Sequence, residues 1–270
     1  MSNISSKIGF LGSGQMATAL ATGFVNAGLI SASQVYAADP FEKAREQFAQ
    51  QVAGATVDSD NKNIVSACDV LFIAVKPQFL EGLAQTIGPV PSDKLIVSIA
   101  AGIQTKQLES WLGTNRIIRV MPNTPCLVGE SAAGFCVADG ATEEDVALVE
   151  QLLGAVGLAY RVEERLMDSV TGLSGSGPAY VYIMIEALSD AGVRVGLPRD
   201  IATKLAAQTV KGAAQMVLQT EEHPAALKDK VTSPGGTTIA GLQALEDHGF
   251  RSALINAVVS ATERSKELGA

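Results

Sequence analysis

Residues 231–241, VTSPGGTTIAG, combine two adjacent glycines with four hydroxyl side chains before an apolar pattern. Ile239, Leu242 and Leu245 recur at helical spacing, so the segment is predicted to be a loop that leads into a helix. The first N–H groups of a helix lack intrahelical acceptors and lie at the positive end of its dipole. A loop that exposes them through glycine is expected to bind an anion such as a carboxylate. The alternative is a capped helix start without a ligand.

A second glycine-bearing loop lies near the N-terminus, where Gly12, Gly14 and Ala17 form the pattern G-x-G-x-x-A. The pattern follows an apolar segment, opens a helical one and precedes Asp39, and these surroundings are typical of a dinucleotide-binding loop. Gly12 permits the turn, Gly14 lets the backbone approach a pyrophosphate, and Ala17 permits close packing of helix on strand. Asp39 is placed to bind the adenosine ribose and to repel the 2′-phosphate of NADP. A tight turn without a ligand and a solvated Asp39 are the alternatives.

The elements around the first loop alternate between strand and helix. Five short apolar segments are predicted to be strands: 7–12, 34–39, 69–75, 94–102 and 116–123. Helical patterns follow at about residue 15, at 41–51 and after Pro77. Apolar strands separated by helices indicate a parallel sheet that is covered on both faces, with ligands at the carboxyl ends of its strands. An α/β Rossmann-type N-terminal domain is predicted for residues 1–163.

From about residue 164 the strand patterns stop, and residues 164–270 are predicted to form an all-α domain. Ser176 is expected to cap a helix over 178–192, a second helix runs from Pro198 to about residue 220, and a third covers 250–268. Val181 and Leu188 belong to an apolar stripe that is expected to lie in the core. Alanines and glycines are frequent here and permit close helix packing. We therefore expect a homodimer or larger homo-oligomer that forms through this domain.

The composition excludes several classes of function. A net charge of −8 argues against nucleic-acid binding. The cysteines Cys68, Cys126 and Cys136 lack C-x-x-C spacing, and the histidines His223 and His248 lie apart, so no metal site is expected. No apolar run approaches the ~18 residues of a membrane span, and the N-terminal residues lack the pattern of a cleavable signal. A cytoplasmic protein without a membrane partner is expected.

A nicotinamide site joined to an anion-binding helical domain predicts hydride transfer involving a small acid. Two-domain 3-hydroxyacid dehydrogenases place a catalytic lysine on the first long helix of the second domain, but residues 178–192 contain neither lysine nor histidine. A cyclic imine fits better, because its protonated form is already an electrophile and needs little acid–base help. The hydroxyl of Thr238 is a candidate to orient or protonate the ring nitrogen.

The chain resembles the pyrroline-5-carboxylate reductase family, and it does so over nearly its whole length. The matching segments occur in the family's order: GFLGSGQMA (9–17), AVKP (74–77), SIAAG (98–102), MPNTP (121–125), LSGSGPAY (173–180), EHPAALKD (222–229) and VTSPGGTTIAGLQALE (231–246). The resemblance implies reduction of 1-pyrroline-5-carboxylate to L-proline by NADH or NADPH. It also implies an interlocked dimer through the helical domain and, in many members, a ring of five dimers.

The resemblance also implies roles for individual residues. Those implied to bind the cofactor are Leu11, Gly12, Ser13, Gly14, Gln15, Met16, Asp39, Asn61, Ala74, Lys76, Pro77, Ala101 and Lys230. Those implied to bind the substrate are Ser233, Gly236, Thr237, Thr238, Glu221 and Glu164, with Thr238 also catalytic. Glu164 and Glu221 have solvated helix-end acids as their alternative reading, and Thr171 is a further candidate for the pocket.

Two questions stay open at this stage. Asp39 favours NADH, whereas Lys230, which replaces an asparagine of some relatives, favours the 2′-phosphate of NADPH. The alternative functions are reduction of a related cyclic imine and a non-catalytic dinucleotide sensor on the same scaffold.

Overall fold

The computed structural model describes residues 4–269, which fall into two compact units. Unit 1 contains the described residues up to Ser176 and those from Ser260 onward, and unit 2 is Gly177–Val259. One boundary between the two units therefore falls within the last helix. The domain boundary expected between residues 163 and 164 stays a prediction. No helix among the described residues is long and apolar enough to cross a membrane.

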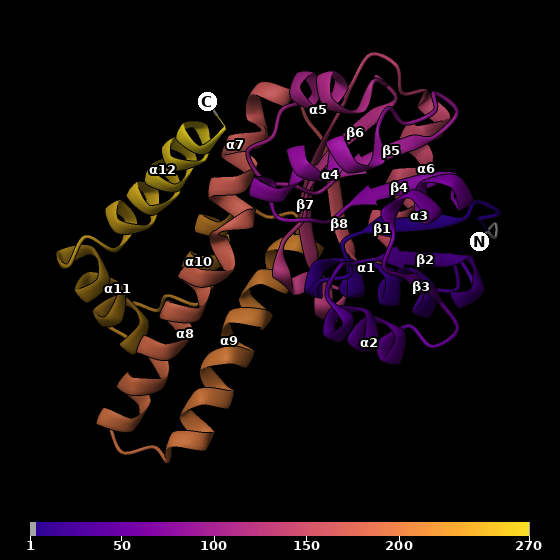
Figure 1. Ribbon diagram of the computed structural model, residues 1–270. Helices are drawn as coiled ribbons and strands as arrows, with labels where there is room; N and C mark the ends of the chain where they lie inside the picture. The colour runs from indigo at the N-terminus through magenta and orange to yellow at the C-terminus, as the bar shows by residue number, and fades with distance from the viewer. Residues whose placement is uncertain (1–3, 270) are drawn as a thin grey trace. The chain divides into compact units, whose positions relative to one another are not determined.

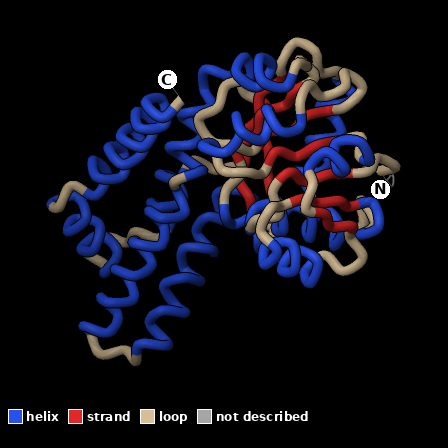
Figure 2. Tube along the Cα trace, in the orientation of Figure 1, coloured by secondary structure: helices blue, strands red, loops and turns tan. Residues whose placement is uncertain are grey.

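Unit 1 is built on one sheet, drawn in red in Figure 2. Within residues 4–269 the sheet has eight strands: β1 (Ile8–Leu11), β2 (Val35–Ala38), β3 (Thr56–Asp58), β4 (Val70–Ile73), β5 (Leu95–Ser98), β6 (Ile117–Met121), β7 (Ser131–Val137) and β8 (Gly157–Arg161). Their order is β3-β2-β1-β4-β5-β6-β7-β8. The strands β2 and β3 lie on one side of β1, and β4 and the later strands lie on the other. The strand order therefore reverses at β1, and ligands bind at such a point in Rossmann folds.

The predicted Rossmann-type α/β class is confirmed, but the sheet is not parallel throughout. Neighbouring strands from β3 to β6 are parallel, β7 is antiparallel to β6, and β8 is parallel to β7. The short 3-10 helix η3 (Thr124–Val128) joins β6 to β7. Because an antiparallel partner needs no helical crossover, this short connection is enough to reverse the chain.

The helices of unit 1 cover both faces of the sheet, as Figure 1 shows. Their bounds are α1 (Gln15–Asn26), α2 (Glu42–Gln51), α3 (Asn61–Ala67), α4 (Leu80–Ile87), α5 (Thr105–Leu112), α6 (Glu143–Gly154) and α7 (Met167–Val170), with 3-10 helices η1 (Ala32–Gln34), η2 (Pro77–Phe79) and η4 (Glu164–Leu166) and a π turn η5 (Thr171–Gly175). Successive strand residues face opposite sides. Phe72 packs with α1 and α2 residues, whereas Leu71 packs with residues of α3, α4 and α5. Each fully buried side chain of this size contributes roughly 1.5–3 kcal/mol.

Unit 2 consists of helices, drawn in blue in Figure 2. They are α8 (Gly177–Arg194), α9 (Arg199–Thr220), α10 (Pro224–Lys230), α11 (Thr237–Asp247) and the first part of α12 (Phe250–Leu268). Ser176 was expected to cap α8, but its backbone is helical (φ −87°, ψ −21°) and continues from the π turn. An N-cap needs extended backbone, so the prediction for Ser176 is wrong.

The helices α8 and α9 form a close antiparallel pair. A side chain added at Gly192 would lie 2.9 Å from the Cβ of Ala202, so the expected small-residue packing is confirmed at this contact. The hydroxyls of Ser189 and Thr203 lie 2.7 Å apart beside it. The predicted core stripe on α8, by contrast, is open in the single chain, where Leu188 is 46% exposed.

Candidate active site

The loop after β1 can be formed only with glycine at its first position. Gly12 has a φ of +99°, and a Cβ there would lie 2.9 Å from the carbonyl carbon and oxygen of Ala74. Its N–H donates to Ala38 O at 2.8 Å, and the N–H of Ala74 donates to Leu11 O at 2.8 Å. The carboxyl ends of β1, β2 and β4 therefore meet here, where the order of the strands reverses.

The start of α1 lies open beside this turn. Gly14 occupies the N-cap position, has no side chain to cap the helix, and would have no atom within 4 Å of an added Cβ. Ser13 is 2% exposed, yet its Oγ has no hydrogen-bond partner in the described part of the chain. Free N–H groups, an unpartnered hydroxyl and open space at Gly14 fit the pyrophosphate of a dinucleotide. Ala17, buried below, packs α1 onto the sheet.

Asp39 follows β2 and is fixed by the backbone. Its Oδ2 accepts the Ser13 N–H at 3.0 Å, and its Oδ1 accepts the Phe41 N–H at 2.9 Å. The Arg45 guanidinium donates to the backbone oxygens of Asp39 and Pro40 at 2.8 and 3.1 Å. The Asp39 carboxylate and an arginine bound to the backbone of the same turn thus lie where the adenosine ribose is expected to bind.

The other predicted cofactor residues of unit 1 follow the neighbouring strands. Asn61 begins α3, and its Oδ1 is buried without a partner among the described residues. Ala74 lies just after β4, and Lys76 is exposed at the start of η2. Ala101 follows β5 and lines a cavity of about 540 Å³ within unit 1. The full lining is Pro77, Gln78, Ala101, Gly102, Ile103, Thr171, Ser176, Ala261, Arg264, Ser265 and Leu268.

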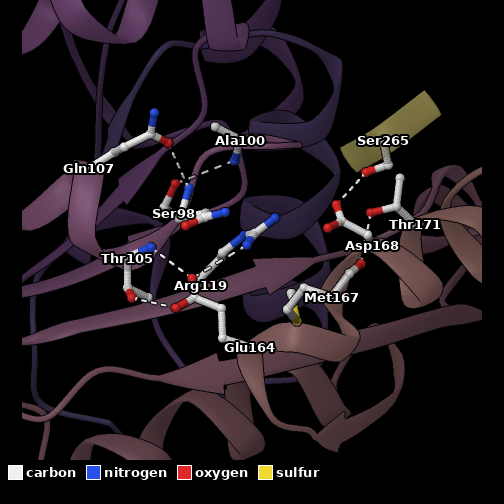
Figure 3. A network of polar contacts seen from close by, with 11 residues as sticks. Ser98, Ala100, Thr105, Gln107, Arg119, Glu164, Met167, Asp168, Thr171 and Ser265 are labelled. Atoms are coloured by element: carbon white, nitrogen blue, oxygen red, sulfur yellow. Dashed lines mark hydrogen bonds and ion pairs between the residues drawn. The ribbon is translucent and has the colours of Figure 1, made fainter. Parts of the chain in front are cut away.

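Glu164 begins η4 and is engaged within unit 1, as Figure 3 shows. Its Oε1 accepts the Thr105 N–H and its Oε2 accepts the Thr105 hydroxyl, each at 2.7 Å. Arg119 Nη1 lies 3.4 Å from Oε1. The structure therefore places Glu164 at the start of α5, and its direct contact with a substrate stays a prediction.

The glycine-rich loop of unit 2 has the predicted form. Gly235 has a φ of +66°, and Gly236 is the N-cap of α11 with no side-chain cap. A Cβ at Gly236 would lie 2.3 Å from Ser233 Oγ, so glycine leaves room for the hydroxyl in its present position. The helix start carries no side-chain cap, and its role in binding an anion stays a prediction. Thr238 is half-buried one residue into the helix.

Two charged residues near this loop differ in their surroundings. Glu221 ends α9 with a φ of +56°, which among the described residues is the one positive φ outside glycine. Such a backbone costs of order 1 kcal/mol or more and places Glu221 at a fixed turn. Lys230 Nζ lies 2.6 Å from Glu222, and the two form an exposed ion pair. The ammonium predicted to meet a 2′-phosphate is therefore partly neutralised by its neighbour.

Comparison with known proteins shows which family the chain belongs to. Residues 164–268 match the model for pyrroline-5-carboxylate reductase dimerisation, and residues 7–102 match that for NADP oxidoreductase, coenzyme F420-dependent. Pyrroline-5-carboxylate reductase from Glycine max is 49% identical over 97% of this chain and 95% of its own length. The chain belongs to the pyrroline-5-carboxylate reductase family.

Solved structures agree with this membership. The Plasmodium falciparum pyrroline carboxylate reductase with NADP bound has a TM-score of 0.90 and 37% identity, and the match covers 100% of both chains. The enzyme from Coxiella burnetii has a TM-score of 0.89 and 33% identity over 99% of this chain and 100% of its own. The reductase from Methanosarcina acetivorans, compared by sequence, is 47% identical over 97% of this chain and 98% of its length.

The sequence interpretation of this reductase family member missed three supporting residues. Asn123 is buried in the MPNTP segment, and its side chain accepts the Ala132 N–H at 3.0 Å and donates to Ser174 O at 3.1 Å. It thereby joins β7 to the π turn. Thr105 and Arg119, which hold Glu164, carry no local motif. Of the three, only Asn123 could have been found from the sequence, because it lies in the MPNTP segment that resembles the family.

Proposed function

We propose that this protein reduces 1-pyrroline-5-carboxylate to L-proline with NADH or NADPH. The observation that carries the proposal is the uncapped start of α11 at Gly236, in a chain of the pyrroline-5-carboxylate reductase family. An uncapped helix start of this kind accepts a carboxylate, and the substrate of the related enzymes carries one.

The cofactor end of the site lies in unit 1. Leu11 to Met16 would hold the pyrophosphate and its adjacent ribose, Asp39 would bind the adenosine ribose, and Asn61 would face the adenine side. Ala74, Lys76 and Pro77 would follow the phosphate-to-ribose path, and Ala101 would lie by the nicotinamide. The buried unpartnered atoms of Ser13 and Asn61 support this placement, because each gains a hydrogen-bond partner when a polar ligand binds. Lys230 of unit 2 remains the proposed contact for a 2′-phosphate.

The substrate end lies in unit 2. The backbone amides around Ser233, Gly236 and Thr237 would bind the carboxylate, and the Thr238 hydroxyl would orient or protonate the ring nitrogen. Glu221, and Glu164 of unit 1, are carried over as substrate-binding residues by the resemblance. The exposed Gly235 and the half-buried, uncapped Gly236 support the carboxylate role.

The chemistry requires little from the protein beyond binding and orientation. The reduced nicotinamide, when bound, supplies a hydride to C5 of the imine. The protein orients the ring and holds a hydroxyl at its nitrogen. Its backbone N–H groups stabilise the negative charge of the substrate carboxylate. The helix α8 supplies no lysine or histidine as an acid or base, which suits a substrate that is already electrophilic when protonated.

The assembly is proposed to be a homodimer through unit 2, and further to be a ring of five dimers. The match to a dimerisation family and the exposed apolar side chains of α8 support self-association through this unit. A cytoplasmic location stays a proposal drawn from the dispersed cysteines.

Steady-state kinetics test the function. The purified protein is mixed with 1-pyrroline-5-carboxylate and NADH or NADPH, and cofactor oxidation and proline formation are both measured. Proline should form in a one-to-one ratio with oxidised cofactor. Absence of proline with both cofactors would refute the proposal.

A further inference from the structure

The segment between β5 and α5 forms one wall of the cavity in unit 1. Ala101, Gly102 and Ile103 line it, and Pro77 follows β4 on the neighbouring side. The segment is anchored at its start, where the Ile99 N–H donates to Ile73 O at 3.1 Å. Its far end is the first residue of α5, Thr105. The position of this wall therefore depends in part on what holds Thr105.

Glu164 holds Thr105 with both of its carboxylate oxygens. The backbone N–H and the hydroxyl of Thr105 each donate at 2.7 Å, and Thr105 is only 6% exposed (Figure 3). Hydrogen bonds to an ionised carboxylate are about twice as strong as neutral ones. The carboxylate also lies at the positive end of the α5 dipole, which favours its charge.

Arg119 also contacts the carboxylate. Its side chain comes from β6 and is 5% exposed, and its Nη1 lies 3.4 Å from Glu164 Oε1. A buried guanidinium requires an anionic partner. Glu164 is therefore held in one orientation by a strand of the sheet, while it holds the start of α5.

Another part of the cavity lining follows Glu164 in the chain. After η4 and α7 the chain enters the π turn, whose Thr171 lines the cavity. Asn123 holds the same turn through Ser174 O at 3.1 Å. One carboxylate thus connects the segment after β5 with the segment that begins at η4.

From this connection we infer that Glu164 is a positioning residue, which acts through Thr105 to hold residues 99–104 against the nicotinamide end of the dinucleotide. The inference rests on the proposed function, because it takes Ala101 as the neighbour of the nicotinamide. It differs from the role implied by resemblance, in which Glu164 touches the substrate itself. Displacements of about 1 Å at such a wall reduce rates strongly, because hydride transfer depends on the orientation of the ring.

The test compares two ligands that differ only in the nicotinamide. Calorimetric titrations with NAD⁺ and ADP-ribose, or with NADP⁺ and 2′-phospho-ADP-ribose, are made on Glu164→Gln, Thr105→Val and the unchanged protein. Both variants should bind the complete dinucleotide about 3- to 30-fold more weakly and the nicotinamide-free ligand within about twofold of the unchanged protein. The kcat should fall while the KM for the imine stays the same.

Two controls separate positioning from general damage. Glu163→Gln removes the neighbouring exposed acid, which pairs with Arg165, and should change nothing. Thr105→Ser keeps the hydroxyl and should restore the affinity that Thr105→Val loses. If Glu164→Gln fails to fold, the Thr105 pair decides the question on its own, because valine preserves the volume of threonine.

Three outcomes would overturn the inference: unchanged affinity for both ligands, equal loss for both ligands, or a raised KM for the imine with unchanged dinucleotide binding. The last result would instead support direct contact between Glu164 and the substrate. The proposed function fails separately, if the unchanged protein forms no proline.

Discussion

The backbone N–H of Ser13 lies 3.0 Å from Oδ2 of Asp39, so the loop after β1 holds the carboxylate that follows β2. Phe41 N–H holds the other oxygen at 2.9 Å. The carboxylate is therefore oriented by the fold before any ligand binds. If the ribose binds here as proposed, the fixed negative charge is predicted to favour NADH over NADPH, and the nearby Arg45 to oppose this preference without removing the charge.

Replacement of Asp39 tests the preference. Asp39→Ser removes the charge, and it should raise the ratio of kcat/KM for NADPH to that for NADH by roughly tenfold, because a like charge near 4 Å costs about 1 kcal/mol or more. Steady-state kinetics with both cofactors measure the ratio. Asp247→Ser, at the end of α11, is the matched control and should leave it unchanged. An unchanged ratio in Asp39→Ser would exclude the carboxylate from cofactor choice.

The two glycines of the first loop should respond differently to alanine. Gly12→Ala places a Cβ 2.9 Å from the Ala74 backbone at a φ of +99°, so it should lower the free energy of unfolding by about 1–3 kcal/mol. Gly14→Ala meets open space at a φ of −72° and should change it by less than about 0.5 kcal/mol. Gly14→Ala should still weaken dinucleotide binding, because its Cβ occupies the place of the ligand. Urea unfolding and calorimetry measure the two effects, and equal destabilisation would contradict this account.

The fold could be predicted from sequence where the pattern was strong and local. The five expected strands are present because their apolar runs are buried on both faces of the sheet. The strands β3, β7 and β8 were not predicted. The strand β3 has only three residues and lies at an edge of the sheet, and β7 is rich in small residues rather than the β-branched residues typical of strands. The antiparallel pairing of β7 with β6 is set by a short connection that carries no periodicity.

The candidate site shows the same limit. Both glycine loops could be found because their turns and helix starts are encoded within a few residues. The support of Glu164 could not, because Thr105 and Arg119 lie 59 and 45 positions away in the chain. The open stripe on α8 was expected to be core, because periodicity marks a buried face without saying which molecule buries it.

Removal of one hydroxyl tests the proposed proton or orientation role of Thr238. Thr238→Val keeps the shape of the side chain and should lower kcat/KM by roughly ten- to a thousandfold, or about 1.4–4 kcal/mol. Thr86→Val removes an exposed hydroxyl of α4, which bonds to Gly82 O, and should have no effect. The carboxylate-binding amides remain in Thr238→Val, so most of the loss should fall in kcat. Unchanged kcat and KM in Thr238→Val would show that the Thr238 hydroxyl has no role in the reaction.

The exposed side chains of α8 should be buried by a second copy. Ile183 is 66% exposed in the single chain, and Ile183→Glu would place a charge in that interface. Analytical ultracentrifugation should show a dimer or larger assembly for the unchanged protein and a shift toward monomer for the variant. Leu158→Glu, on the exposed edge strand β8, is the control and should leave the mass unchanged. A monomeric unchanged protein would contradict the prediction.

The Arg116–Asp145 pair gives a pH-dependent contribution to stability. Burial of Asp145 raises its pKa, but hydrogen bonds from Arg116 and Thr142 outweigh burial and leave the pKa below its ordinary value of 3.8. The unfolded chain therefore binds the proton more readily, so the contribution is complete above about pH 4 and is lost as the pH falls through the lower native pKa.

Asp145→Asn should remove this contribution. The carboxylate accepts two Arg116 N–H groups at 2.7 and 2.8 Å and is 4% exposed, so the loss at pH 7 should be about 2–4 kcal/mol in the free energy of unfolding. The difference from the unchanged protein should shrink as the pH falls from about 4 through the lowered native pKa of Asp145, since only below that pKa do both proteins carry a neutral group. Glu143→Gln, which breaks an exposed pair with Arg161, should cost less than about 1 kcal/mol at either pH. Urea unfolding at both pH values checks the prediction, and a difference that does not depend on pH would show that packing, not charge, stabilises the site.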